Sequence, residues 1–288
     1  MTKTVAVLGV GMMGSAMARR LAATGHEVRA FDRSSLALSA LGDENILVAR
    51  SIEEAASGSD AVITMVPTGD IVASLAEQFL PVMSSDAVWI QTSTVGATWT
   101  ERLYVQAERA GRHMIDSPVS GSTQPAESGQ LTMIVSGPLG SLDRVRGILE
   151  ALGGRTINVG TRAEASDTKL VVNAWMLTAT LAMGEALQSC DDLHIGVEGF
   201  LSVLRGGPLN MDYALAKADE MLHDQYPPGF PAELAHKDLD LAIDAMGYTP
   251  RLLATVRSAL DGVMADGHGR DDVGVLGQAA RRHEGMPS

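Results

Sequence analysis

The sequence is poor in cysteine and in positive charge, and it lacks a long hydrophobic run. Its single cysteine, Cys190, excludes an intramolecular disulfide and is typical of a reducing compartment, so we expect a cytoplasmic protein. The formal net charge of −13 opposes general binding to nucleic acid or to an anionic membrane, because either partner would be repelled at long range. The longest charge-free apolar tract, Leu170 to Gly184, is shorter than the ~20 residues of a membrane span and contains Asn173. We therefore expect a soluble protein.

The spacing typical of metal ligands is also lacking. Asp191, Asp192 and His194 lie near Cys190, but adjacent side chains on a helix point in different directions, and the seven histidines show no ligand spacing elsewhere. We therefore expect no metal site. The first apolar run begins at Thr4, close to the N-terminus, so we expect no signal peptide.

The order of the hydrophobic patterns predicts two domains. From residue 4 to about 159, short β-rich runs alternate with helical patterns, which is typical of a parallel sheet covered by helices on both faces. From Glu164 onward the patterns are helical, beginning with a tract to Leu193 that is apolar on nearly every face and belongs either to one large core or to an interface between subunits. We predict an α/β chain, with a Rossmann-type doubly wound sheet over residues 1–162 and an all-α substrate and dimerisation domain over residues 163–288.

A glycine-rich turn joins the first predicted strand to the first predicted helix. The apolar run Thr4–Leu8 precedes it and a helical pattern from Ser15 follows, which is the context that a dinucleotide-binding G-x-G-x-x-G motif requires. The first glycine permits the tight turn, the second lets the backbone approach a pyrophosphate, and the third allows the helix to pack closely on the strand. A purely structural glycine turn is the alternative. The predicted cofactor-binding residues of this turn are Gly9, Val10, Gly11, Met12, Met13 and Gly14.

The end of the second predicted strand, Glu27–Phe31, indicates which nicotinamide cofactor fits. Asp32 stands where a carboxylate accepts the ribose hydroxyls of NAD, whereas Arg33 follows at once and suits the 2′-phosphate of NADP. A guanidinium can bind phosphate bidentately and Ser34 adds a hydroxyl donor, while Asp32 would repel a phosphate aimed at it. We predict that NADP is preferred, with NAD as the alternative. Arg33 is then the discriminating residue, unless its side chain is only a solvated surface charge.

Further candidate residues follow predicted strands at the edge where open α/β sheets bind their ligands. Val66 and Pro67 follow the fourth strand, and Thr94 follows the fifth. The next loop, Asp116 to Ser122, is rich in small residues whose backbone N–H groups and hydroxyls can hold a carboxylate. Such a run is also typical of an ordinary turn. The sequence therefore indicates a ligand site at this edge, with the role of the last loop open.

Two lysines are candidates for the chemistry. Lys169 and Asn173 lie four residues apart, so a helix places both on one face. An ammonium group in apolar surroundings exchanges a proton more readily, so Lys169 is a candidate acid/base unless it extends to solvent from the first turn of the helix. Asn173 can orient a carbonyl or hydroxyl oxygen beside it. Lys237 with Asp238 is either an ordinary exposed charge pair or a second cation for an acidic substrate or the cofactor.

Four separated motifs resemble, in the same order, those of the β-hydroxyacid dehydrogenases, which include 3-hydroxyisobutyrate dehydrogenase, tartronate semialdehyde reductase and the glyoxylate/succinic semialdehyde reductases. The resemblance covers nearly the whole chain. It implies an N-terminal Rossmann domain, an all-α C-terminal domain like that of 6-phosphogluconate dehydrogenase, and a homodimer or homotetramer. The motifs are Gly9–Gly14, Asp116–Gly121, Lys169–Asn173 and Lys237–Leu239.

The resemblance also implies roles for single residues in an NAD(P)-dependent oxidoreductase that acts on a small carboxylate-bearing β-hydroxyacid or its semialdehyde. Lys169 would be the acid/base, and Asn173 would orient the substrate. Thr94 would line the nicotinamide end of the site, and Val66 and Pro67 would also bind the cofactor. The implied substrate-binding residues are Ser120, Gly121, Ser122, Thr123 and Lys237, and Lys237 would also close over the cofactor.

The chain departs from the family pattern around the pocket. Ser122 stands where a second glycine is common, Ala163 and Ala165 stand where glycines commonly precede the catalytic helix, and Ala174 stands where a second asparagine is frequent. These changes leave the substrate open. An imine reductase of the same architecture is one alternative, although such enzymes usually carry Asp or Tyr in place of Lys169. A non-catalytic dinucleotide-sensing protein is the alternative from another class.

Overall fold

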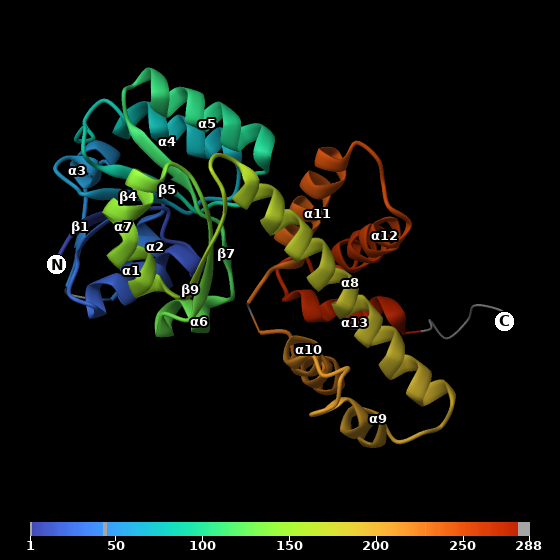
Figure 1. Cartoon of the computed structure of the whole chain (residues 1–288). Coiled ribbons are helices and arrows are strands. Elements are labelled where there is room, and N and C mark those ends of the chain that lie inside the picture. Colours follow the sequence, from blue (N-terminus) through green and yellow to red (C-terminus); the bar gives the residue numbers. More distant parts are fainter. Residues whose placement is uncertain (1, 43–44, 228, 282–288) are drawn as a thin grey trace. The chain divides into compact units, whose positions relative to one another are not determined.

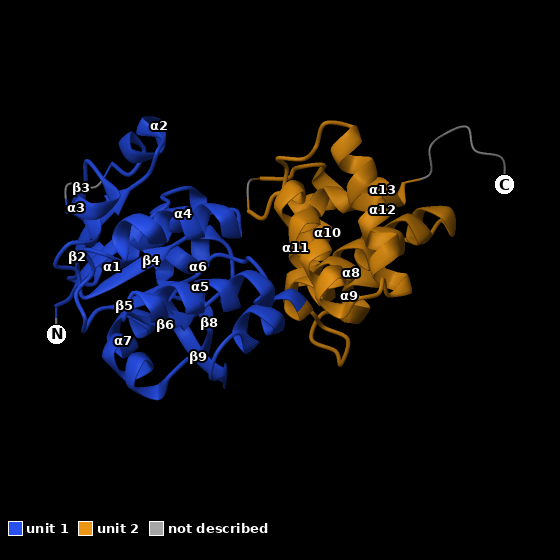
Figure 2. Cartoon of the chain, turned by 90° about the horizontal axis from the view of Figure 1, so that it is seen from above, with its two compact units in different colours: residues 1–170 blue, residues 171–288 orange. Residues whose placement is uncertain are grey.

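The computed structural model describes residues 2–42, 45–227 and 229–281. The chain forms two compact units, residues 1–170 and 171–288 (Figure 2), and the division falls inside the long helix α8 (Glu164–Asp192). The domain bounds predicted from the sequence place the whole of α8 in the second domain, and they stay a prediction. Each unit is described here by itself.

The first unit is built on one sheet (Figure 1). Within the described residues the sheet has nine strands in the order β3-β2-β1-β4-β5-β6-β8-β7, with β9 paired to β8. The strands are β1 (Thr4–Leu8), β2 (Glu27–Phe31), β3 (Ile46–Val48), β4 (Ala61–Thr64), β5 (Val88–Gln91), β6 (His113–Asp116), β7 (Val119–Ser120), β8 (Leu131–Ser136) and β9 (Gly153–Gly160). The strands from β3 to β6 are parallel, whereas β8 runs antiparallel to both β6 and β7. The predicted doubly wound sheet is confirmed, and its strand order reverses between β1 and β4.

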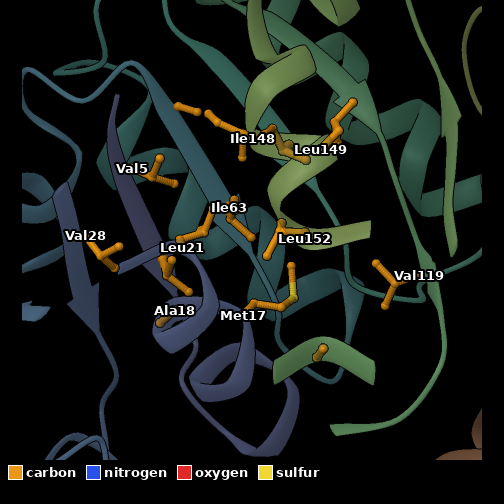
Figure 3. Packing of buried hydrophobic residues seen from close by; sticks show 14 of the residues in the cluster. Val5, Met17, Ala18, Leu21, Val28, Ile63, Val119, Ile148, Leu149 and Leu152 are labelled. Atoms are coloured by element: carbon orange, nitrogen blue, oxygen red, sulfur yellow. The ribbon is translucent and has the colours of Figure 1, made fainter. Parts of the chain in front are cut away.

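Alternation along the strands builds a core on each face of the sheet. In β1, Val5 and Val7 enter the cluster that α1 and α7 cover (Figure 3), whereas Ala6 and Leu8 enter the cluster that α3, α4 and α5 cover. Burial on both faces explains why β1 is apolar from Val5 to Leu8. The helices of this unit are α1 (Met12–Ala23), α2 (Ser35–Ser39), α3 (Ile52–Ala56), α4 (Gly69–Phe79), α5 (Ala97–Arg109), α6 (Thr123–Ser128) and α7 (Leu139–Leu152).

The second unit is helical throughout its described residues, apart from one isolated β-bridge between Pro231 and Asp272. Besides most of α8, it contains α9 (Val197–Leu204), α10 (Asp212–His223), α11 (Ala232–Met246), α12 (Arg251–Ala265), the 3-10 helix η1 (Val273–Val275) and α13 (Leu276–Ala280). A buried ion cluster ties α10 to the start of η1, since Lys217 Nζ lies 2.7 Å from Glu220 Oε1 and 2.6 Å from Asp272 Oδ1. The predicted all-α second half is therefore confirmed.

Helix α8 carries apolar residues on an uncovered face as well as in the core. Leu177 is fully buried, but Val171 and Trp175 are 67% and 64% exposed. The sequence left open whether this helix belongs to one large core or to an interface between subunits. Leu177 belongs to a core of this chain, whereas the face that carries Val171 and Trp175 is exposed in the described chain. Among the described helices, α8 is long and apolar enough to cross a membrane by length and composition, a test that the core helix of a soluble protein also passes.

Candidate active site

The glycine turn after β1 is shaped by two close approaches and one open position. Gly9 has φ +93°, and a Cβ atom there would lie 2.6 Å from Val66 Cγ1. A Cβ atom on Gly14 would overlap the carbonyl oxygen of Gly9, whereas one on Gly11 would meet no atom within 4 Å. The fold therefore requires Gly9 and Gly14 for its own packing, while the space beside Gly11 is left open.

The turn leads into the N-terminus of α1. Gly11 is the N-cap residue and no side chain caps the helix there, so the first N–H groups of α1 are available to an anion. Register places the turn at the end of the two neighbouring strands, because Leu8 pairs with both Phe31 and Thr64. An uncapped helix start beside an open glycine position, at the point where the strand order reverses, fits the pyrophosphate of a dinucleotide.

Asp32 is bound by backbone groups on both of its oxygens. Its Oδ2 accepts a hydrogen bond of 2.9 Å from Val10 N–H, and its Oδ1 accepts one of 2.8 Å from Ser34 N–H. The Ser34 hydroxyl in turn accepts from Ala37 N–H and caps α2. Arg33 is exposed, and no ion pair holds its guanidinium within the described chain. Asp32 thus links the glycine turn to the end of β2, and the neighbouring cation is left to solvent.

The ends of β4 and β5 are joined by a buried side-chain network that the sequence did not reveal. Ser93 Oγ accepts a hydrogen bond of 2.8 Å from Val66 N–H, and Ser93 N–H donates to Gln91 Oε1 at 2.7 Å. Thr92 Oγ1 donates to the carbonyl oxygen of Thr64 at 2.7 Å. The hydrogen bond from Val66 N–H to Ser93 therefore fixes the chain just after β4 at the carboxyl edge of the sheet.

The predicted carboxylate loop follows β7 and runs into α6. Ser120 ends β7, and Gly121 follows with φ +131°, a backbone conformation that side chains rarely adopt. Ser122 is the exposed N-cap residue of α6 and Thr123 is its first residue. The substrate-binding residues predicted on this loop are therefore consecutive at one turn, and their role stays a prediction.

Helix α8 begins on buried side chains of the sheet unit. Asp116 is fully buried, and its Oδ2 accepts a hydrogen bond of 2.7 Å from Ser166 N–H. Ser136 Oγ accepts one of 3.1 Å from Ala165 N–H. Burial raises the pKa of the Asp116 carboxyl to about 7. Hydrogen bonds from buried side chains therefore hold the first turn of α8, which precedes Lys169. One of these side chains, Asp116, is an acid whose pKa lies near neutral pH.

Asn173 is oriented by an acid that the sequence suggested to be exposed. Its Nδ2 donates a hydrogen bond of 2.6 Å to Oδ2 of Asp238, which is only 3% exposed, and Lys237 Nζ lies 2.8 Å from Asp238 Oδ1. The interpretation of Lys237 and Asp238 as an ordinary exposed pair is therefore wrong for Asp238. Because a carboxylate cannot donate, the amide must turn its nitrogen toward Asp238. Asn173 Oδ1 is then buried without a hydrogen-bond partner in the described chain.

Lys169 lies four residues before Asn173 on α8 and is partly buried. The helix therefore presents both side chains on one face, as predicted. The structure brings Asn173 and Lys237 together through Asp238, and it gathers the glycine turn, Asp32 and Val66 at the sheet edge. Within the described residues no group of three or more His, Cys, Asp or Glu side chains could hold a metal ion.

Two family models together span most of the chain. The NAD binding domain of 6-phosphogluconate dehydrogenase matches residues 4–160, and the NAD-binding domain of NADP-dependent 3-hydroxyisobutyrate dehydrogenase matches residues 163–278. By sequence, the chain is 30% identical to a probable 3-hydroxyisobutyrate dehydrogenase of Mycobacterium tuberculosis, over 85% of this chain and 86% of the relative. It is 29% identical to the 3-sulfolactaldehyde reductase of Escherichia coli, over 98% and 97% of the two chains.

One solved structure supports the same family, and a second shares the fold. The 3-hydroxyisobutyrate dehydrogenase of Mycobacterium tuberculosis, solved with L-serine, matches with a TM-score of 0.89 and 29% identity, over 98% of this chain and 100% of that one. An imine reductase from Myxococcus stipitatus, solved with NAD+, matches with a TM-score of 0.63 and 19% identity, over 98% and 100%, and shares the fold alone. The chain therefore belongs to the β-hydroxyacid dehydrogenase family, and it is an NAD(P)-dependent oxidoreductase that acts on CH–OH groups.

Proposed function

We propose that the chain interconverts a small β-hydroxyacid and its semialdehyde, with Lys169 as the acid/base. The observation that carries this proposal is the orientation of Asn173, whose Nδ2 is tied to buried Asp238 while its Oδ1 is buried without a hydrogen-bond partner in the described chain. A buried carbonyl oxygen without a donor is costly, so it calls for a donor from a ligand, and a substrate hydroxyl supplies one. Lys169 lies four residues before Asn173 on α8, on the same helix face, and we assign it to the same hydroxyl.

We assign separate roles in the reaction to Lys169, to the loop Ser120–Thr123 and to Lys237. Bound nicotinamide supplies or accepts the hydride. When the carbonyl is reduced, negative charge develops on its oxygen, and the Lys169 ammonium stabilises that charge and donates the proton. When the hydroxyl is oxidised, the neutral Lys169 amine takes the proton back. We assign the substrate carboxylate to Ser120–Thr123, with Lys237 as a second cation.

A substrate panel tests this function. Semialdehydes, ketoacids, β-hydroxyacids including L-serine, and cyclic imines would be assayed in both directions, with NADH and NADPH in parallel. We expect turnover of carboxylate-bearing semialdehydes and hydroxyacids, and a large loss when the carboxylate is replaced by an amide. Turnover of imines alone would contradict the proposal in favour of an imine reductase. Tight NADPH binding with no turnover of any compound would indicate a dinucleotide sensor.

We further propose that NADP is preferred and that Arg33 selects it. The exposed guanidinium has no ion pair within the described chain, and both oxygens of Asp32 are engaged by backbone N–H groups, which offset its repulsion of a phosphate. Arg33→Ala should weaken NADPH binding by about 10- to 100-fold, the value of one charge-assisted hydrogen bond, and NADH binding by less than about twofold. Fluorescence titration of both cofactors measures this.

Arg144→Ala, on α7, is the matched control for Arg33→Ala, because it removes an exposed guanidinium that pairs with Asp86. It should leave both cofactor affinities unchanged. Equal weakening of NADPH and NADH in Arg33→Ala would refute a contact with the 2′-phosphate.

We also propose that the working enzyme is a cytoplasmic homodimer or homotetramer. The exposed apolar pair Val171 and Trp175 lies four residues apart on one face of α8, where a second copy of the chain would cover it. If a second copy of the chain covers this face, the apolar composition of α8 is explained by contact between subunits and requires no membrane. A single species at the chain mass of 30.2 kDa in sedimentation equilibrium would contradict this assembly.

A further inference from the structure

We propose that Asp116 is a positioning residue, whose buried carboxyl group fixes the first turn of α8 and thereby the side chain of Lys169. The proposal rests on the role proposed above for Lys169. Asp116 ends β6, is fully buried, and accepts the Ser166 N–H at 2.7 Å. Ser166 precedes Lys169 by three residues, so the anchored amide lies less than one helical turn before the lysine.

Asp116 differs in kind from the neighbouring anchors of this turn. Ser136 Oγ accepts the Ala165 N–H at 3.1 Å, and the hydroxyls of Thr100 and Ser166 lie 2.8 Å apart. Those anchors are neutral hydroxyls, whose strength does not change with pH. Asp116 is an acid. When it loses its proton, its hydrogen bond with Ser166 N–H becomes stronger and a negative charge appears next to the first turn of α8.

One oxygen of Asp116 indicates which form the fold favours. Asp116 Oδ1 and the hydroxyl of the next residue, Ser117, are both buried without a hydrogen-bond partner in the described chain. Burying an ionised carboxylate oxygen that accepts no hydrogen bond costs free energy of folding. A protonated oxygen carries no charge and can donate a hydrogen bond to an acceptor or to a bound water. The neutral acid is therefore the form that the site accommodates best, in agreement with the pKa of about 7 that burial gives Asp116.

The two carboxylates closest in sequence to Ser166 also favour the neutral form of Asp116. Glu164 and Asp167, on the first turn of α8, both oppose its ionisation. Tyr104 Oη accepts the Asp116 N–H at 3.2 Å, and the Arg162 guanidinium stacks 4.9 Å from the Tyr104 ring. Above neutral pH an ionised Asp116 places a negative charge beneath the turn that leads to Lys169. Because Ser166 and Lys169 lie within one helical turn, we expect that charge to favour the ammonium form of Lys169.

The sign of the stability effect follows from linkage. The pKa of Asp116 is about 7 in the folded chain and near its ordinary value of 3.8 when unfolded. The folded state therefore holds the extra proton between these values, so this contribution to stability is full below 3.8 and is lost as the pH rises to about 7.

The test compares Asp116→Asn and Asp116→Ala, with Ser136→Ala as the matched control. Asp116→Ala should lower kcat by about tenfold or more through misplacement of Lys169, with the Kd for NADPH within about twofold of wild type. Asp116→Asn keeps a neutral acceptor for Ser166, so kcat should stay within about threefold, while Tm should become less dependent on pH between 4 and 7. Ser136→Ala should lower Tm without changing how Tm or kcat depends on pH.

A second readout separates electrostatics from packing. In the reduction direction, kcat falls at high pH as Lys169 loses its proton, and Asp116→Asn should move this fall to lower pH because the negative charge is gone. The proposal is overturned if the Tm of Asp116→Asn follows pH as wild type does, or if Lys169→Ala is inactive while both Asp116 variants keep wild-type kcat and pH profiles. If Asp116→Ala does not fold, Asp116→Asn decides the question. Turnover retained by Lys169→Ala would instead mark failure of the proposed function.

Discussion

Lys169→Ala is expected to lower kcat by about 10²- to 10⁴-fold, the usual contribution of general acid–base catalysis, while the Kd for NADPH stays within about twofold of wild type. The reason is that charge develops on the substrate oxygen during hydride transfer and needs a cation that can also donate a proton. Asn173, held by Asp238, would still orient the substrate, so KM should change less than kcat. Steady-state kinetics in both directions and fluorescence titration of NADPH measure these quantities.

Two further variants make the Lys169 prediction specific. Lys169→Arg keeps the positive charge but cannot release a proton near neutral pH, so it should remain impaired. Lys3→Ala removes an exposed lysine that pairs with Asp60 and should behave as wild type. Added primary amines should restore part of the activity of Lys169→Ala, and not that of Lys169→Arg. Substantial activity of Lys169→Ala across pH, without added amine, would show that Lys169 is not the acid/base.

The bounds of the central strands follow from the sequence because their causes are local. Strands β1 (Thr4–Leu8) and β2 (Glu27–Phe31) are found at the predicted bounds. The apolar run of β1 specifies a strand buried on both faces, whereas the alternation in β2 buries Val28 and Ala30 and leaves Glu27 exposed. The glycine turn was predictable for the same reason, because its spacing encodes a backbone path within a few residues. The predicted strand–turn–helix unit is therefore confirmed.

Short elements were missed because their stability comes from distant partners. Strand β7 has two residues and exists by pairing antiparallel with β8, as Val119 does with Met133. Helix α6 contains Pro125 and small polar residues, which predict a turn by local preference, yet it packs on α1. Strand β9 begins at Gly153 and Gly154, because pairing with β8 overrides the low strand propensity of glycine.

The candidate site shows the same limit. The sequence identified Lys169 and Asn173 from their spacing on one helix. It did not indicate that Asp116 would hold Ser166 or that Asp238 would hold Asn173, because these pairs are separated by 50 and 65 residues. A contact between a buried acid and the first turn of α8 therefore becomes visible only when the fold brings the two segments together.

Alanine substitutions at Gly11 and Gly14 are expected to impair cofactor binding strongly, each for a different reason. A Cβ atom on Gly11 meets no atom within 4 Å, so Gly11→Ala should keep the wild-type Tm to within a few degrees. The same methyl group occupies the open space at the start of α1, where a pyrophosphate would approach the backbone, so NADPH binding should weaken by about 10²-fold or more.

In Gly14→Ala the added methyl group overlaps the carbonyl oxygen of Gly9. This oxygen belongs to the backbone, so it cannot move aside as the end of a flexible side chain could. The helix must move off the sheet, so we expect a marked fall in Tm by thermal unfolding together with loss of NADPH binding. Gly25→Ala is not a suitable control because φ is +86° there, whereas Gly140→Ala in α7 adds a methyl group to open space and should change neither quantity. If Gly11→Ala bound NADPH normally, the cofactor would not approach the backbone at this turn. An equal fall in Tm for both substitutions would remove the distinction between the packing glycine and the binding glycine.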